Sequence, residues 1–140
     1  MLEERLFDAG DGSHLIELPT KVVLPVSEEE FLGKFGLLPS MPGDLRRFQR
    51  RYLRCKAPFR ILTALPAFPR DSEACQVYTR DISIGGIGFM AHQQLFPSEQ
   101  AVLSLPNIGE RRIAITSCRY INPYCYEAGA TFIAPSKGSD

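Results

Sequence analysis

The feature that most constrains the fold is a series of short apolar runs separated by proline, glycine, asparagine and serine. The runs are rich in β-branched and aromatic residues, which favour strands. Several short strands bounded by turn signals are typical of a β-barrel or β-sandwich. The sequence predicts six strands, at residues 59–65, 75–82, 87–91, 101–105, 112–121 and 126–133.

The alternation of residues within the expected strand at 112–121 predicts which side chains face the core. Side chains two positions apart share a face of a strand. Ile113 and Ile115, and at the end of the strand Ser117, would therefore point one way, and the residues between them the other way. The stretch at residues 45–52 has apolar residues on one helical face, but the sequence does not decide whether it is a helix or a loop.

The chain before residue 45 has a different character. Ser27 followed by Glu30 forms a capping box, and the apolar spacing after it predicts a short helix at residues 28–35. The apolar run at residues 22–24, between two prolines, is either an edge strand or a strap. We therefore divide the chain into an N-terminal extension at 1–44, a β-domain at 45–134 and a disordered tail at 135–140.

The charge is distributed unevenly over a chain whose formal net charge is zero. Residues 1–44 carry nine acids and three bases, whereas residues 45–140 carry seven acids and thirteen bases. An apolar fraction of 44% with 23% charged residues excludes a wholly disordered or fibrous chain. The split indicates an anionic partner for the second part.

Compartment signals are few. The acidic N-terminus lacks the long apolar segment of a signal peptide, and no apolar run approaches the roughly 20 residues that span a bilayer. The four cysteines form no Cys-x-x-Cys pair, so we expect reduced thiols in a cytoplasmic protein and no metal site.

The bases gather in one segment that contains both arginine and aromatic residues. Guanidinium groups bind phosphate or the O6/N7 edge of guanine in a bidentate way and stack on flat rings. Taken alone, the segment is better explained as a solvated basic face of a short helix, because short basic runs are common. The cluster consists of Arg46, Arg47, Arg50, Arg51 and Arg54, with Phe48 and Tyr52 between them.

The second cluster is the segment from Asp81 to Gly86, between two expected strands. Asp81 and Ser83 would project to the same side of an extended chain, where a carboxylate can accept hydrogen bonds from a guanine edge. Gly85 and Gly86 permit a positive φ and a close backbone approach to a ligand. The alternative is an ordinary hairpin turn in which a side chain bonds to its own backbone.

Together the two clusters resemble the PilZ domain family, over roughly residues 45–134. That family has an Arg-x-x-x-Arg motif before the first strand and an (Asp/Asn)-x-Ser-x-x-Gly motif after the second. Arg50 and Arg54 match the first motif, and Asp81, Ser83 and Gly86 match the second. The segment at residues 127–132 is similar to the family's last strand. The resemblance implies a six-stranded antiparallel β-barrel in a bacterial protein that binds cyclic di-GMP.

What the resemblance implies for the site is specific. Arg50 and Arg54 would hold phosphate and one guanine face, and Asp81 and Ser83 would read guanine edges, with Gly85 and Gly86 beside them. Arg46/Arg50 and Arg47/Arg51 also satisfy the first motif, but Arg50/Arg54 best fits the family's distance to the first strand. Additional contacts could come from the neighbouring residues Arg46, Arg47, Gln49 and Arg51.

Two departures from the family affect what can be carried over. Many relatives continue into a C-terminal helix, for which no pattern remains after residue 134. Gln49 stands where some relatives have an arginine that accompanies binding of a ligand pair, so one or two ligands per chain are both open.

The sequence therefore favours a non-enzymatic receptor that changes its loop and interface conformation on binding cyclic di-GMP and so signals to a partner protein. No catalytic residue and no cofactor is expected, since no nucleophile–base set or metal cluster has an interpretable spacing. The alternatives are a ligand-independent PilZ-like adaptor and, less favoured, a β-barrel that binds single-stranded nucleic acid without specificity. Oligomeric state and the role of residues 1–44 stay open.

Overall fold

The fold is known from a computed structural model, which describes residues 18–36, 49–63 and 73–134. Arg46, Arg47, the Pro/Gly-rich segment at 39–43 and the expected disordered tail lie outside the described residues. No helix in the described ranges is long and apolar enough to cross a membrane.

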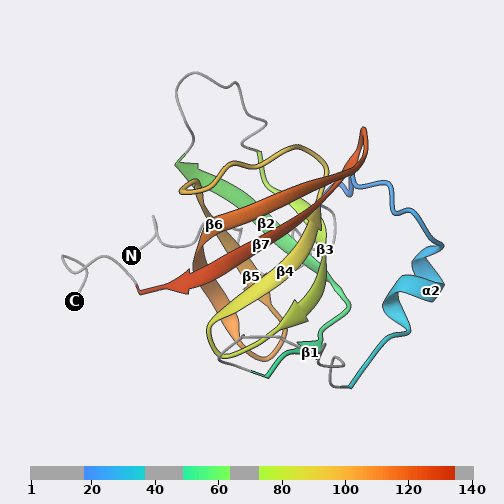
Figure 1. The fold of residues 1–140 in the computed structure, drawn as a ribbon, viewed down its shortest axis with the longest axis horizontal. Helices are drawn as coiled ribbons and strands as arrows, with labels where there is room; N and C mark the ends of the chain where they lie inside the picture. Colours follow the sequence, from blue (N-terminus) through green and yellow to red (C-terminus); the bar gives the residue numbers. More distant parts are fainter. Residues whose placement is uncertain (1–17, 37–48, 64–72, 135–140) are drawn as a thin grey trace, which may run out of the picture.

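Six strands form a closed antiparallel β-barrel, as predicted (Figure 1). Each strand pairs with two neighbours in the order β3–β2–β5–β6–β7–β4, and a final pairing of β4 with β3 closes the barrel. A short additional strand, β1 (Arg51–Tyr52), pairs with the end of β3. The barrel strands are β2 (Lys56–Thr63), β3 (Cys75–Ile82), β4 (Gly86–Ala91), β5 (Gln100–Leu105), β6 (Gly109–Asn122) and β7 (Cys125–Ile133).

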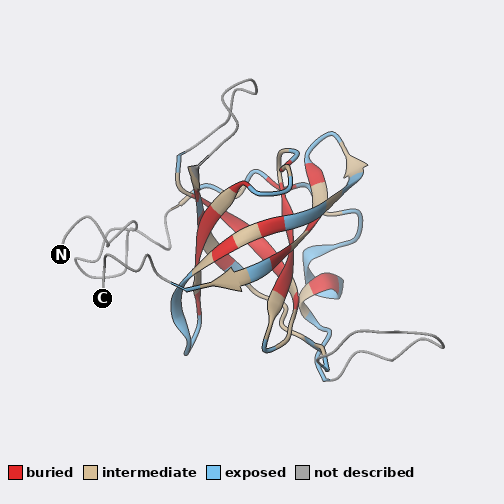
Figure 2. Cartoon of the chain, turned by 60° about the vertical axis from the view of Figure 1, so that its left-hand side comes forward, coloured by how far each residue is buried: buried red, intermediate tan, exposed pale blue. Residues whose placement is uncertain are grey.

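The core fills the inside of the barrel with alternate side chains of every strand (Figure 2). Phe59 of β2 and Phe89 of β4 pack with ring centroids 5.3 Å apart, and Leu103 and Ile113 are fully buried beside them. Burying large side chains removes apolar surface from water, which is the main favourable term for folding. All four cysteines are free thiols.

The expected strand positions are confirmed, with changes at their ends. β2 begins at Lys56 and β6 is longer in both directions than the apolar pattern indicates. For the stretch at 45–52, the sequence left helix and loop open. Its last two residues form β1, which is neither. A strand ends where its backbone hydrogen bonds to the neighbouring strands end, and these bonds can continue past the last apolar residue.

One expected side-chain direction is wrong, because β6 contains a β-bulge. Ile115 pairs with Ala130 and Ser117 pairs with Gly129, which leaves Thr116 as an extra residue. A bulge shifts the alternation by one position. Ser117 is therefore exposed, whereas Ile113 and Ile115 are buried as expected.

The helix of the N-terminal extension is shorter than expected. α2 (Glu28–Leu32) begins where the capping box predicts it, and the Ser27 hydroxyl accepts a hydrogen bond of 3.0 Å from the amide of Glu30. The helix ends at Gly33, which lacks the side chain that favours helical backbone. Phe35 is thus not part of the helix and is largely exposed.

The apolar run at residues 22–24 is a strap and not an edge strand. The bridge between Thr20 and Gln76 lies just before the run, and within the run the Val23 amide donates a hydrogen bond of 3.0 Å to the carbonyl of Tyr124 without forming a strand. Val22 and Phe31 of α2 are buried against Tyr78, Met90 and other residues on the outside of the barrel. This second cluster attaches the N-terminal extension to β3 and β4.

The attachment of α2 includes one polar contact with a pH dependence. The hydroxyl of Tyr78 donates a hydrogen bond of 2.7 Å to Glu28, whose carboxylate also pairs with Lys56 at 3.0 Å. Burial, together with the hydrogen bond to Glu28, raises the pKa of Tyr78 to about 12. The same hydrogen bond, followed by the one from Lys56, lowers the pKa of Glu28.

We expect this contact to stabilise the fold at neutral pH and to be lost at alkaline pH. A phenol whose pKa is raised on folding contributes its full stability below the ordinary value of about 10 and loses it as pH rises toward 12. Thermal unfolding between pH 9 and 12 should therefore show a steeper loss for the wild type than for Tyr78→Phe. Parallel curves for the two proteins would contradict the assignment.

Candidate functional site

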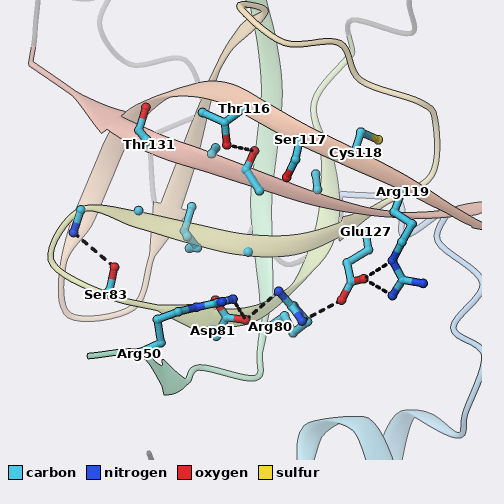
Figure 3. Close-up of a pocket in the computed structure, with 17 residues that line it drawn as sticks. Arg50, Arg80, Asp81, Ser83, Thr116, Ser117, Cys118, Arg119, Glu127 and Thr131 are labelled. Atoms are coloured by element: carbon cyan, nitrogen blue, oxygen red, sulfur yellow. Dashed lines mark hydrogen bonds and ion pairs between the residues drawn. The ribbon is translucent and has the colours of Figure 1, made fainter. Parts of the chain in front are cut away.

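A pocket of about 660 Å³ lies on the outer face of the barrel, over β3, β4, β6 and β7 (Figure 3). This volume falls within the usual range of small-molecule sites, roughly 300–1,000 Å³. Along β7, the pocket residues Glu127, Gly129 and Thr131 alternate with the buried Ala128 and Ala130. The pocket therefore lies on the face of the sheet opposite to the core.

Glycines form the floor of this pocket. Gly88 of β4 is paired directly with Gly129 of β7, so two neighbouring positions on the outer face carry no side chain. A Cβ on Gly88 would lie 3.1 Å from the Arg80 guanidinium, and one on Gly129 would lie 2.7 Å from the Ser117 hydroxyl. The space that a side chain would take at these two glycines is therefore occupied by the Arg80 guanidinium, the Asp81 carboxylate and the Ser117 hydroxyl.

A β-bulge places two charged side chains side by side on this floor. Thr79 pairs with Phe89 and Asp81 pairs with Gly88, so Arg80 is the extra residue in β3. The two residues of a bulge do not alternate as in a regular strand, and Arg80 and Asp81 both line the pocket. Bulges are frequent next to functional sites because they redirect a side chain in this way.

Arg50 and Asp81, which come from the two different motifs, meet at the edge of the pocket. Arg50 Nε donates a hydrogen bond of 3.1 Å to Asp81 Oδ1, and its Nη2 lies 2.6 Å from Oδ2. The residue Asp81 is only 2% exposed. The hydrogen bond to Oδ1 and the ion contact at Oδ2 together hold both groups at defined positions.

Arg80 continues the contacts across the floor. Its Nη2 lies 2.9 Å from Asp81 Oδ2, and its Nη1 lies 2.7 Å from Glu127 Oε2. Glu127 also accepts a hydrogen bond of 3.0 Å from Arg119 Nε. The contacts of Asp81 Oδ2 are close but lack hydrogen-bond geometry, so among the described residues Oδ2 and Arg80 Nε are buried polar atoms without a hydrogen bond.

The turn between β3 and β4 supplies the remaining motif residues. Ser83 donates its amide to the carbonyl of Gly86 at 2.9 Å, and its hydroxyl accepts from the amide of Gly85 at 3.3 Å. The side chain thus makes the local turn bond that the sequence allowed as the alternative, while still lining the pocket. Neither Gly85 nor Gly86 uses a positive φ.

Gly86 has a reason for being glycine that the sequence did not reveal. A Cβ at this position would lie 2.4 Å from the carbonyl oxygen of Ala130. At Gly86, the backbones of β4 and β7 approach each other closely, and this contact requires glycine. This approach closes one end of the pocket, which Gly86 also lines.

Arg54 does not line the pocket with Arg50. Its guanidinium lies 4.1 Å from the ring centre of Phe31 and 4.9 Å from that of Tyr52. It donates to the backbone carbonyls of Arg80 at 2.9 Å and Phe31 at 3.3 Å. Burial lowers the pKa of the guanidinium. Arg54 thus connects α2 to the barrel, and its role as a ligand residue stays a prediction.

Of the further candidates in the arginine segment, the two that the structure describes are not brought to the pocket. Gln49 and Arg51 are exposed and do not line it, while Arg46 and Arg47 lie outside the described residues. The structure therefore brings together five of the six principal candidates: Arg50, Asp81, Ser83, Gly85 and Gly86.

Sequence reasoning missed three charged residues of the pocket, Arg80, Arg119 and Glu127. They belong to neither motif. Arg80 follows the alternation of β3, in which Val77 faces the core and Tyr78 the outside, and the bulge adds Asp81 to the same outer face. Arg119 and Glu127 are paired across the β6–β7 hairpin. Their opposite charges on either side of the turn at residues 122–124 are the signal that could have predicted this pair.

No protein-family model matches this chain, and no curated protein matches it in sequence. In the described residues, no group of three or more His, Cys, Asp or Glu side chains could hold a metal ion. The site presents guanidinium donors and carboxylate acceptors, which are the groups that bind polar and anionic ligands.

Proposed function

We propose that this protein is a PilZ-like receptor that binds cyclic di-GMP in the barrel pocket and acts without catalysing a reaction. The observation that carries the proposal is the pair of Arg50 and Asp81. These residues are the matched arginine and aspartate of two motifs separated by 31 positions in sequence, and their side chains meet at the pocket.

The chemistry of the pocket suits this ligand. Cyclic di-GMP carries two phosphate charges and two guanines. Arginine binds phosphate and the O6/N7 edge of guanine, and a carboxylate accepts from the donors on the opposite edge. Arg50 and Asp81 supply both kinds of group.

Ligand binding would be signalled through the segment that precedes β1. A ligand that engages Arg50 competes with its ion pair to Asp81 and so changes the position of this segment. Four residues later, Arg54 contacts the backbone and ring of Phe31 in α2. We propose that a change at Arg50 alters this surface, where a partner protein would bind.

One titration tests the proposal. Isothermal calorimetry with cyclic di-GMP should give saturable binding, whereas GTP and single-stranded DNA at equal concentration should bind far more weakly. An absence of binding to all three would favour the ligand-independent adaptor. Preferred binding of DNA, with an affinity that falls steeply as salt rises, would favour the nucleic-acid binder.

A further inference from the structure

The pocket contains a row of five charged side chains in which the signs alternate (Figure 3). The row runs from Arg50 through Asp81, Arg80 and Glu127 to Arg119, and each neighbouring pair is in contact. Only the first two belong to the motifs that suggest cyclic di-GMP. The other three have no role in the proposed function so far.

The row contains the same combination twice. At one end of the row Arg50 contacts Asp81, and at the other end Arg119 contacts Glu127. Arg80 lies between the two carboxylates, 2.9 Å from one and 2.7 Å from the other. The pocket thus presents two carboxylate–arginine pairs that share a central guanidinium.

This combination is selective for guanine. The Watson–Crick edge of guanine presents two adjacent donors, N1–H and N2–H₂, which match the two oxygens of a carboxylate. Adenine presents an acceptor at N1 beside its N6 donor, so a carboxylate cannot match both groups. A glutamine or asparagine amide, which carries a donor and an acceptor, suits adenine better.

Glu127 is able to accept a base in this way. Its side chain is 15% exposed at the pocket surface. A carboxylate has about four lone-pair positions. In the described residues, Glu127 contacts Arg119 through Oε1 and Arg80 through Oε2, which does not fill all four positions. Arg119 is 70% exposed, so its contacts with Glu127 lie at the surface and not in the core.

We propose that Glu127, positioned by Arg80 and Arg119, reads the second guanine of the ligand, while Asp81 reads the first. This inference rests on the proposed function. It assigns specificity to a residue outside both motifs, and it explains why one pocket carries two carboxylates although its ligand is an anion.

The test compares two ligands of equal charge. Cyclic di-GMP and the hybrid cyclic dinucleotide with one guanine and one adenine are both dianions, so a general change in pocket charge cancels in the ratio of their affinities. We expect the wild type to prefer cyclic di-GMP. In Glu127→Gln the ratio should fall roughly tenfold or more, toward or below one, because the amide matches adenine.

Two variants control the experiment. Glu110→Gln removes the same charge from an exposed residue of β6 that does not line the pocket, and it should leave the ratio unchanged. Arg119→Ala removes a positioning contact of Glu127 at an exposed site, and it should lower the ratio by a smaller factor.

The outcomes separate the two proposals. If the wild type binds cyclic di-GMP and neither Glu127→Gln nor Arg119→Ala changes the ratio, the role of Glu127 is wrong and the proposed function stands. If the wild type does not bind cyclic di-GMP, the proposed function itself fails. Should Glu127→Gln not fold in a thermal melt, Arg119→Ala decides, and an unchanged ratio overturns the inference.

Discussion

Arg50→Ala is expected to weaken the binding of cyclic di-GMP roughly tenfold to hundredfold, which is the range for a lost bidentate contact of about 1–3 kcal/mol. Arg50 supplies guanidinium donors at the pocket edge, and it holds Asp81 through two contacts of 3.1 and 2.6 Å. Removing it therefore takes away a ligand contact and loosens a second one. Calorimetric titration at a fixed salt concentration measures the loss.

Arg51→Ala is the matched control for this prediction. It removes the same charge from the next residue, whose side chain is exposed and does not line the pocket. Binding should change less than about twofold, as expected for a rim charge that makes no contact. If Arg47→Ala and Arg51→Ala abolished binding while Arg50→Ala and Arg54→Ala did not, the arginine register would be wrong.

Gly86→Ala is expected to lower the free energy of unfolding by about 3 kcal/mol, at the upper end of the usual cost of overpacking. The added Cβ would lie 2.4 Å from the backbone oxygen of Ala130. Because that atom belongs to β7 and not to a flexible side chain, β4 and β7 must move apart. Urea unfolding followed by circular dichroism measures the change.

Gly88→Ala is the comparison for this variant. It is two residues away in the same strand, but its Cβ would meet the side-chain ends of Arg80 and Asp81 at 3.1 Å. Side-chain ends can shift by a few tenths of an ångström at little cost, so the loss of stability should be clearly smaller. Equal losses for Gly86→Ala and Gly88→Ala would show that the strand contact is not what requires glycine at 86.

The uneven distribution of charge between residues 1–44 and 45–140 appears in the structure as individual ion pairs. Glu28, from the acidic N-terminal extension, pairs with Lys56 and accepts from Tyr78 on the outside of the barrel. The three arginines of the pocket contact two acids, Asp81 and Glu127. Attraction between groups falls with distance and screening, so these bases interact with the acids that the fold places beside them.

The strands of the barrel could be predicted because the signals for them are local. Alternation of apolar residues and the turn residues between them act within a few positions of the chain. They located six strands, and the capping box located the start of α2 at Glu28. The two motif segments could be found in the same way, since each is a short run of neighbouring residues.

The arrangement of the site depended on contacts that no local pattern records. The extra residues Arg80 and Thr116 in two bulges redirect side chains at one edge of the pocket. Arg50 lines the pocket and Arg54 does not. Arg54 instead packs on the ring of Phe31, which belongs to the docked helix α2.

The sequence by itself determined that this chain is all-β, either a barrel or a sandwich, with an appended helix, and that it carries an arginine segment and an Asp-x-Ser-x-x-Gly turn. These properties follow from the preferences of residues close together in the chain. Only the tertiary structure decided that Arg50 meets Asp81, that Arg80 bridges Asp81 and Glu127, and that Gly88 and Gly129 form a floor. Such contacts join residues far apart in sequence, and their geometry is set by strand register and bulges, which arise from the packing of the whole barrel.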